Sequence, residues 1–331
     1  MRAVVIGAGV GGACAALALT EIGVTVQIYE ASERSADVSG WVTLGPSAST
    51  VLDQLGVGAE VRRRGFPVTR VTTTDTVSGR QHSFERFEET HRWPSTHVWR
   101  RDLLSVLRTR LAEVGVTSCF GSRVDPADVA ADLLVGADGA RSMTRRALGD
   151  HRDPTFAGQL ICYGHSEHVL GELPEGVLHF WSRPDGVAGY AGHRGHGSFW
   201  FSRGDAESAQ SATGQPELLA ALADLPIAKL VESSRVSRPV ALYELEPSGI
   251  WHTTTTVLIG DAAHAVSPAA GRGASSAIED AVFLARAIRD SPTVEAGLQA
   301  YDRIRRPVAM HTYRPTPGLR VPRVSAAELR W

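Results

Sequence analysis

The stretch RAVVIGAGVGG, residues 2–12, decides the fold of this chain. Residues 2–6 form a β-rich, mostly apolar run, and the glycines that follow fit the pattern GxGxxG at the start of an alanine-rich helix. Glycines at this spacing let the backbone approach a pyrophosphate, while the helix N-terminus presents free N–H groups to it. The stretch therefore predicts a dinucleotide-binding βαβ unit, whose expected cofactor-binding residues are Gly7, Gly9, Val10, Gly11 and Gly12.

The second strand of this unit is expected over residues 24–29 and is followed by Glu30. In dinucleotide-binding folds, an acid about 20 residues beyond the glycines accepts a hydrogen bond from a ribose hydroxyl. Glu30 is therefore the candidate ribose-binding residue. Because FAD-binding and NAD-binding proteins share both features, further motifs are needed to separate the two.

Composition and charge exclude several classes of protein. The chain has 331 residues, 43% hydrophobic and 21% charged, with a formal net charge of -2, which does not favour nucleic-acid binding. Glycines interrupt the N-terminal apolar run, and no later run approaches the roughly 18 residues of a membrane span. The three cysteines are far apart, which is typical of reduced thiols. We therefore expect a cytoplasmic protein that binds neither nucleic acid nor a membrane.

Two further motifs follow predicted strands. The stretch GADGARS occupies residues 136–142, and GDAAHAVSPAAGRGASSAIEDA occupies residues 260–281. A simple two-half NAD fold does not require the second of these. Together with GxGxxG and the helix start at Arg100, they resemble, in the same order, the motifs of the class A flavoprotein monooxygenases, the p-hydroxybenzoate hydroxylase-like family. The resemblance covers residues 2 to about 290.

The resemblance implies an α/β fold, in which a Rossmann-like FAD-binding domain of the glutathione reductase type carries an inserted antiparallel substrate-binding sheet. The β-like runs and glycine-rich turns of residues 155–205 agree with such a sheet. The expected FAD-binding domain comprises residues 1–65, 97–153 and 250–290. The expected substrate domain comprises residues 66–96 and 154–249, and a C-terminal helix and tail would take residues 291–331.

The resemblance also implies how the chain contacts FAD. Asp261 would bind the ribityl chain, residues 268–273 would pass beside the isoalloxazine ring, and the helix from about Ala274 would point its N-terminus at the pyrimidine edge. A helix N-terminus there would stabilise the negative charge of reduced flavin. The further residues implied to bind FAD are Arg100, Val124, Asp138, Asp261, Pro268, Gly271, Arg272, Gly273, Ala274 and Ser275.

The chain departs from the family pattern at several positions. Trp41 stands where small glycines are usual, Arg272 replaces the usual glutamine, and Ser275 replaces the usual asparagine. Only residues 125–134 occupy the interval in which most relatives carry a β-hairpin. We therefore expect an altered flavin environment in a compact chain.

Aromatic and histidine residues supply the remaining candidates. The expected substrate-binding residues are Trp41, Phe180, Tyr190 and Trp200. No catalytic base is legible, and the candidates for a catalytic role are Pro268, His264, His179 and His193, of which His264 is also interpreted as a structural residue of its motif. The two HxxH pairs lie on predicted strands, where positions three apart face opposite sides, so no metal site is expected.

The function implied by the resemblance is that of an FAD-dependent monooxygenase of secondary metabolism. It would use NADPH or NADH and dioxygen to hydroxylate or epoxidise an apolar aromatic or polyketide-like small molecule through a flavin hydroperoxide. The alternatives are an FAD-dependent reductase or dehydrogenase that inserts no oxygen, and a non-catalytic binding protein that keeps the flavin fold. The oligomeric state is left open.

Overall fold

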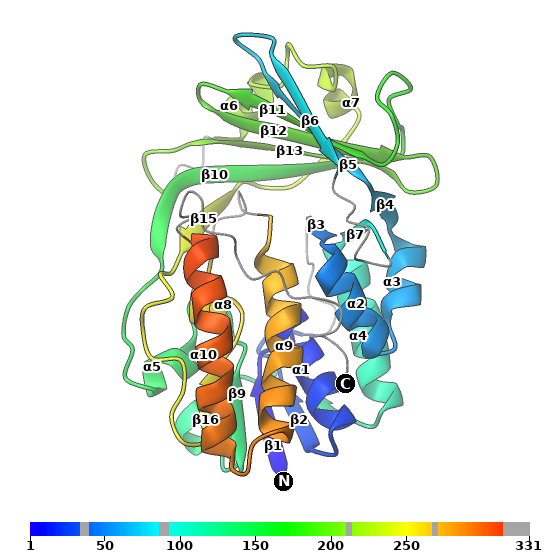
Figure 1. Ribbon diagram of the computed structural model, residues 1–331. Coiled ribbons are helices and arrows are strands. Elements are labelled where there is room, and N and C mark those ends of the chain that lie inside the picture. Colours follow the sequence, from blue (N-terminus) through cyan, green and yellow to red (C-terminus); the bar gives the residue numbers. More distant parts are fainter. Residues whose placement is uncertain (34–39, 86–92, 210–213, 267–270, 314–331) are drawn as a thin grey trace.

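The computed structural model describes residues 1–33, 40–85, 93–209, 214–266 and 271–313. A parallel sheet with its helices forms one half of the molecule, and a larger sheet forms the other half (Figure 1). A three-stranded sheet lies where the two halves meet, in the order β3 (Trp41–Leu44), β7 (Ser95–Trp99), β4 (Phe66–Val68). The expected α/β fold with a Rossmann-like sheet and a second, separate sheet is confirmed.

The parallel sheet has the strand order β16-β9-β1-β2-β8, and every pair in it is parallel. Its strands are β1 (Arg2–Ile6), β2 (Thr25–Tyr29), β8 (Thr117–Cys119), β9 (Leu133–Gly136) and β16 (Thr256–Leu258). Between β8 and β9 the described chain forms only a short 3-10 turn, η1 (Pro126–Asp128), in the interval where a hairpin is usual for the family. Because all five strands run in the same direction, their carboxyl ends lie at one edge of the sheet. This edge is where ligands bind in open α/β sheets.

Helix α1 (Val10–Glu21) packs closely between this sheet and α9 (Gly273–Arg289). Small residues make this contact possible, since a Cβ on Gly11 would lie 3.2 Å from the Ala277 Cβ. A Cβ on Gly12 would lie 1.9 Å from the Gly7 carbonyl oxygen, which leaves room for glycine alone. The other helices of this half are α2 (Pro46–Gln54), α3 (Gly58–Arg64), α4 (Arg100–Glu113), α5 (Met143–Ala147), α8 (Asp261–His264) and α10 (Val294–Tyr313).

The larger sheet has the order β14-β10-β13-β12-β11-β5-β6, with β15 also paired to β10. An antiparallel sheet was expected, and most pairs are antiparallel, but β11 pairs with β5 in parallel. Its strands are β5 (Arg70–Asp75), β6 (Gln81–Glu85), β10 (Thr155–Ser166), β11 (Val177–Arg183), β12 (Gly186–His193), β13 (Gly197–Asp205), β14 (Arg235–Val236) and β15 (Val240–Glu244).

The two faces of this sheet have different roles. One face packs under α6 (Gly214–Ala220), α7 (Ala228–Glu232) and the residues between them, and forms a core around Trp181 and Trp200. The opposite face packs on Phe66 and Trp41 and therefore turns toward the parallel-sheet half. None of the described helices is both long and apolar enough to cross a membrane.

Replacing Trp200 by Ala tests the assignment of the two faces. Trp200 is fully buried and its indole N–H donates to the Ser234 Oγ at 2.8 Å. Its loss should lower the free energy of unfolding by about 3–5 kcal/mol, the usual cost of deleting a buried tryptophan. Urea unfolding measures this effect, with Phe180→Ala, a change on the opposite and less buried face, as the control. A W200A variant no less stable than F180A would contradict the assignment.

Candidate active site

The turn after β1 forms an open cradle at the carboxyl edge of the parallel sheet. Gly7 has φ +103°, and a Cβ there would lie 2.3 Å from the Ala137 carbonyl oxygen, so this turn touches the loop after β9. A Cβ on Gly9 would meet nothing within 4 Å, so space lies open in front of the turn. Helix α1 begins there without a side-chain cap or an acidic residue in its first turn. Its free N–H groups are therefore available to an anion.

Glu30 is fixed at the end of the neighbouring strand. One carboxylate oxygen accepts a hydrogen bond from the Ala8 N–H at 2.8 Å, and the other accepts from the Ser32 N–H at 2.8 Å. The side chain is only partly buried, which leaves it accessible to a ribose. Val124 packs beside Tyr29 in a small apolar cluster at the same end of the sheet.

The loop after β9 uses its acid internally. One oxygen of Asp138 accepts from the Ser142 hydroxyl, and the other accepts from the Thr144 N–H and hydroxyl at 3.0 and 3.1 Å. The carboxylate therefore shapes the turn that starts α5, instead of facing outward as the expected cofactor contact implied. Gly139, at φ +78° and with nothing within 4 Å of an added Cβ, is the open position of this loop.

Asp261 is an accessible carboxylate deep in the protein. Its side chain is exposed, although its neighbours Gly260 and Ala262 are buried. Desolvation by the surrounding protein raises the pKa of Asp261, and the charges of His264 and Arg100 partly oppose this rise. A carboxylate that is exposed to solvent and also desolvated by surrounding protein must lie on a concave part of the surface, which we call the hollow. Arg100, at the start of α4, lies on the same hollow with its side chain exposed.

His264 belongs to a buried polar network and is not a free base. Its Nε2 lies 2.7 Å from Asp280 Oδ2, and that oxygen also accepts from the Gly260 N–H at 2.9 Å. Arg305 donates from Nε to the other Asp280 oxygen at 2.7 Å. Burial alone would raise the pKa of Asp280, but the charges of His264 and Arg305 outweigh it and hold this pKa well below its usual range. The structural interpretation of His264 fits these contacts.

The N-terminus of α9 closes one side of the hollow. Gly271 has φ +59°, with open space beside it. The Ser275 Oγ accepts a hydrogen bond from the Gly45 N–H at 3.1 Å, so this departure from the family joins α9 to the turn after β3. Arg272 turns back along the helix, with Nη2 3.9 Å from Glu279 Oε1. Gly273 and Ala274, in the first turn, are both partly accessible. Pro268 lies outside the described residues.

Aromatic side chains from β3 and from the larger sheet gather beside the site, where the charge of Arg100 acts on both Tyr163 and Asp261. The Trp41 ring lies 5.3 Å from the Tyr163 ring, 5.4 Å from Phe199 and 6.2 Å from Phe201. Phe180 packs against Phe201 at 6.0 Å on the same face. Of the expected substrate-binding residues, Trp41 and Phe180 therefore lie on either side of Phe201. The partly exposed Tyr163 and Phe201 were missed.

Tyr190 and Trp200 do not line this pocket, which corrects the expectation. Both point into the core under α6 and α7, because neighbouring residues of a strand face opposite sides. The Tyr190 hydroxyl accepts from the Leu170 N–H, and Trp200 donates to Ser234. The signal in the sequence was the alternation itself. The structure adds that Phe199 and Phe201 share the face opposite to Trp200, and that Phe201 is partly exposed there while Phe199 is buried against Phe66.

The candidate histidines are also displaced from the pocket centre. His179 is buried on the helix-covered face, with its ring 5.9 Å from Trp181. His193 stands at the end of β12, where it stacks on Phe66 at 5.3 Å and lies 3.8 Å from Glu175. The part of the chain that the structure describes contains no group of three side chains suited to a metal ion.

A phenol and an arginine bring polarity into the aromatic pocket. Arg203 lies two residues beyond Phe201 on β13, on the same face, and it forms no ion pair with the described residues, although the charge of Asp205 acts on it. Its buried Nε has no hydrogen-bond partner among these residues. Burial lowers the pKa of the Arg203 guanidinium, against the attraction of Tyr163 and Asp205. Burial raises the pKa of the Tyr163 phenol, while Arg100 and Arg203 oppose the rise. Sequence patterns gave no sign of this pair.

Comparison with known proteins decides the family. Residues 1–127 and 250–316 match the family described as the FAD binding domain. This chain belongs to that family. The matched residues include four of the five strands of the parallel sheet, β1, β2, β8 and β16, together with α1 and α9. They leave out β9 and most of the larger sheet.

Named relatives of this FAD-binding-domain protein are oxygenases. The 3-hydroxybenzoate 6-hydroxylase of Klebsiella oxytoca is 26% identical, covering 87% of this chain and 80% of the relative. The 3-amino-4-hydroxybenzoate 2-monooxygenase PtnB3 of Streptomyces platensis is 29% identical, covering 95% and 86%. The crystal structure of a variant of Klebsiella pneumoniae HpxO, complexed with FAD, superposes with a TM-score of 0.79 at 25% identity, covering 95% and 87%.

The hollow of this FAD-binding-domain protein fits FAD. Space for the pyrophosphate lies open at Gly9 and Gly139, in front of the uncapped α1. Glu30 and Val124 stand where the adenosine half would lie, and the accessible Asp261 stands where a ribityl hydroxyl could donate to it. FAD, once bound, supplies the redox chemistry and the activation of oxygen that no side chain provides.

Replacing Asp261 by Asn should separate cofactor affinity from stability. Because the pKa of Asp261 is raised, the folded state binds its proton more tightly than the unfolded state, so stability falls as pH rises toward the folded-state pKa. Asn removes this loss, so D261N apoprotein should gain stability relative to the unmodified protein between mildly acidic and neutral pH, as urea unfolding would measure. FAD should bind about tenfold or more weakly, the effect of losing a charged acceptor. Unchanged affinity in a fluorescence titration with FAD would exclude the role given to Asp261.

Proposed function

We propose that this protein is an FAD-dependent monooxygenase that uses NADPH or NADH and dioxygen to hydroxylate a small aromatic molecule. The family match and the oxygenase relatives support the cofactor and the reaction class. The observation that carries the proposal is the position of the aromatic pocket. Trp41 packs on the partly exposed Tyr163 and Phe201, and the charge of Arg100 acts on both Tyr163 and Asp261, so these aromatic side chains lie beside the exposed acid.

The proposed substrate is an aromatic acid or another aromatic anion. Trp41 and Phe201 offer flat apolar surfaces to a ring, and Arg203 offers a guanidinium that has no carboxylate within ion-pair distance in the described part of the chain. A desolvated, unpaired guanidinium is costly in a pocket unless an anion binds to it. Tyr163, next to Arg203, can donate its phenolic hydrogen to the same anion or to a ring hydroxyl.

The chain positions its ligands and excludes water. The aromatic roof covers a substrate ring on one side, and the larger sheet separates it from solvent. The N-terminus of α9 places its free N–H groups and the positive end of its dipole at the hollow, where they favour negative charge on the pyrimidine edge of a bound flavin. Glu30 and Asp261 hold the two halves of the cofactor by accepting hydrogen bonds.

We also propose the domain assignment and the location. The FAD-binding part would be residues 1–65, 97–153 and 250–290, and the substrate part residues 66–96 and 154–249, since β5 and β6 join the strands of the second segment in one sheet. Cys14, Cys119 and Cys162 are free thiols, which fits the reducing cytoplasm.

The test is a flavin spectrum followed by anaerobic reduction. The purified protein is mixed with FAD, then titrated with NADPH or NADH with and without 3-hydroxybenzoate or 3-amino-4-hydroxybenzoate, and oxygen is admitted last. Bleaching accelerated by the acid, with an oxygenated product by mass spectrometry, is the expected result. A protein that does not bind FAD overturns the enzymatic proposal, and bleaching without product in a wider panel of aromatic acids favours a reductase.

Replacing Arg203 by Gln should weaken the binding of an aromatic acid without affecting FAD. Loss of a charge-assisted hydrogen bond of about 1.5–3 kcal/mol corresponds to a roughly 10- to 100-fold rise in the KM of the acid. The matched control is Arg194→Gln, since Arg194 lies exposed at the β12–β13 turn and pairs with Glu175. Steady-state kinetics with the acid and with its uncharged amide measure the effect. An equal rise for the amide would contradict a role in recognising charge.

A further inference from the structure

Two segments that join the two halves of the molecule lie side by side. The outgoing segment, residues 148–154, runs from α5 to β10, and the return strap, which we define as residues 245–251, leads from β15 back toward β16. They are neighbours because β15 pairs with the beginning of β10 (Figure 1). Any rotation of the larger sheet about this connection must therefore move both segments.

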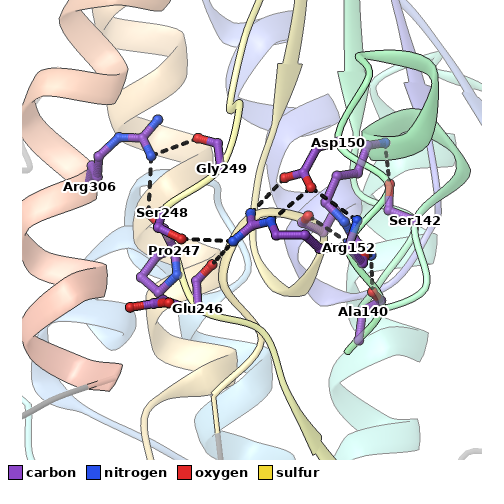
Figure 2. Close-up of polar contacts among 11 residues, drawn as sticks. Ala140, Ser142, Asp150, Arg152, Glu246, Pro247, Ser248, Gly249 and Arg306 are labelled. Atoms are coloured by element: carbon purple, nitrogen blue, oxygen red, sulfur yellow. Dashed lines mark hydrogen bonds and ion pairs between the residues drawn. The ribbon is translucent and has the colours of Figure 1, made fainter. Parts of the chain in front are cut away.

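Arg152 of the outgoing segment binds the return strap. Its Nε and Nη2 donate to the two oxygens of Asp150 at 2.8 and 2.6 Å, which fixes the orientation of the guanidinium. Its Nη1 then donates to the Glu246 carbonyl oxygen at 3.2 Å and to the Ser248 Oγ at 2.8 Å (Figure 2). The planar guanidinium thus donates hydrogen bonds to the Asp150 carboxylate and to the strap at the same time. The single ammonium group of lysine cannot reproduce this geometry.

Arg306 of α10 repeats this arrangement. Asp302 accepts hydrogen bonds from its Nε and Nη2 at 2.6 and 2.8 Å. Its Nη1 donates to the carbonyl oxygens of Pro247 and Gly249 at 3.0 and 2.9 Å (Figure 2). Its guanidinium also lies 4.7 Å from the centre of the Trp251 ring. Residues 246–249 of the strap therefore accept hydrogen bonds alternately from Arg152 and from Arg306. An aspartate fixes the orientation of each guanidinium.

The strap has no space to move toward Arg152. A Cβ on Gly249 would lie 1.9 Å from Arg152 Nη2 and 2.0 Å from Asp150 Oδ2. The φ of Gly249 is not among the positive values, so the tight fit at this position comes from the two side chains and not from the backbone conformation. A larger residue would separate the strap from the Arg152–Asp150 pair, by displacing either the strap or the two side chains.

The strap is attached to the FAD-binding motif at both of its ends. The Leu245 N–H donates to the Ala265 carbonyl oxygen at 2.8 Å, and the Trp251 ring packs 5.3 Å from His264. The buried Arg145 completes the connection, because it donates to the carbonyl oxygens of Ala262 at 3.1 Å and Arg152 at 3.2 Å. Helix α8, which carries Asp261, is thus linked to the outgoing segment and to the strap.

We propose that Arg152 and Arg306 are positioning residues that clamp the return strap, so that the larger sheet and its aromatic pocket keep a fixed position over α8. This inference rests on the proposed function in taking α8 as part of the FAD site, but the clamp itself is defined by contacts within the chain. When the clamp is loosened, α8 and the strap become mobile together, while β1 and α1 are unaffected.

Hydrogen exchange with mass spectrometry tests the clamp on the FAD-loaded protein without turnover. Arg152→Met and Gly249→Ala disturb the same contact from opposite sides, and each should raise exchange about tenfold or more in peptides covering residues 243–251 and 261–266. Peptides from β1 and α1 should exchange as in the unmodified protein. The control is Arg146→Met, because Arg146 pairs with Asp153 of the outgoing segment and forms no hydrogen bond or ion pair with the described residues of the strap.

A second measurement distinguishes a clamp from general stabilisation. Fluorescence titration should show FAD binding to R152M and G249A about tenfold more weakly, with R146M unchanged. Faster exchange confined to residues 148–154, or spread evenly over the whole chain, would overturn the proposal. Failure of the unmodified protein to oxidise NADPH or NADH would count against the proposed function only, since neither readout depends on catalysis.

Discussion

The buried carboxylate of Asp280 is the constraint on which the cofactor half depends. It is fully buried, and it accepts hydrogen bonds from the Gly260 N–H, from His264 and from Arg305. Removing a partner from a buried ion pair typically costs several kcal/mol, because the remaining charge has no water to replace it. These partners come from the turn before α8, from α8 itself and from α10. One charge on α9 therefore sets the position of α8, and with it the position of Asp261.

The same dependence explains how an accessible carboxylate can stand in a deep hollow. The protein around Asp261 disfavours its ionised form, since desolvation raises its pKa. Contacts made by the residues next to it in the chain hold it in this position. Arg145 holds the Ala262 carbonyl, and the return strap holds Ala265. Asp261 is thus kept exposed in an environment that disfavours its charge. The buried contacts among Asp280, His264 and Arg305 hold α8 in place against this unfavourable free energy. Because the return strap leads from the larger sheet and bonds to Ala265, the larger sheet is attached to the same residues that hold Asp261.

Motifs identified the cofactor side of this protein because its chemistry is local. The turn at Gly7, the acid Glu30 and the accessible Asp261 each stand at the end of one parallel strand, so short stretches of sequence were enough to predict them. Asp138 shows the limit of this reasoning, because its motif was present while its carboxylate is occupied by Ser142 and Thr144. The motif specifies a turn, and which atoms of the turn are free depends on its hydrogen bonds.

The sequence by itself determined the βαβ opening and the presence of a second sheet, because these follow from glycine spacing and from short-range periodicity. The choice of FAD came from the resemblance of the later motifs to a known family. Tertiary structure alone decided which face of that sheet meets the cofactor half. Adjacent strand residues point in opposite directions, so Trp200 enters the core under α6 and α7 while Phe201 and Arg203 face the aromatic pocket. The clamp on the strap likewise joins Arg152, Gly249 and Arg306, residues far apart in the chain, whose contact depends on pairings between distant strands that no local pattern encodes.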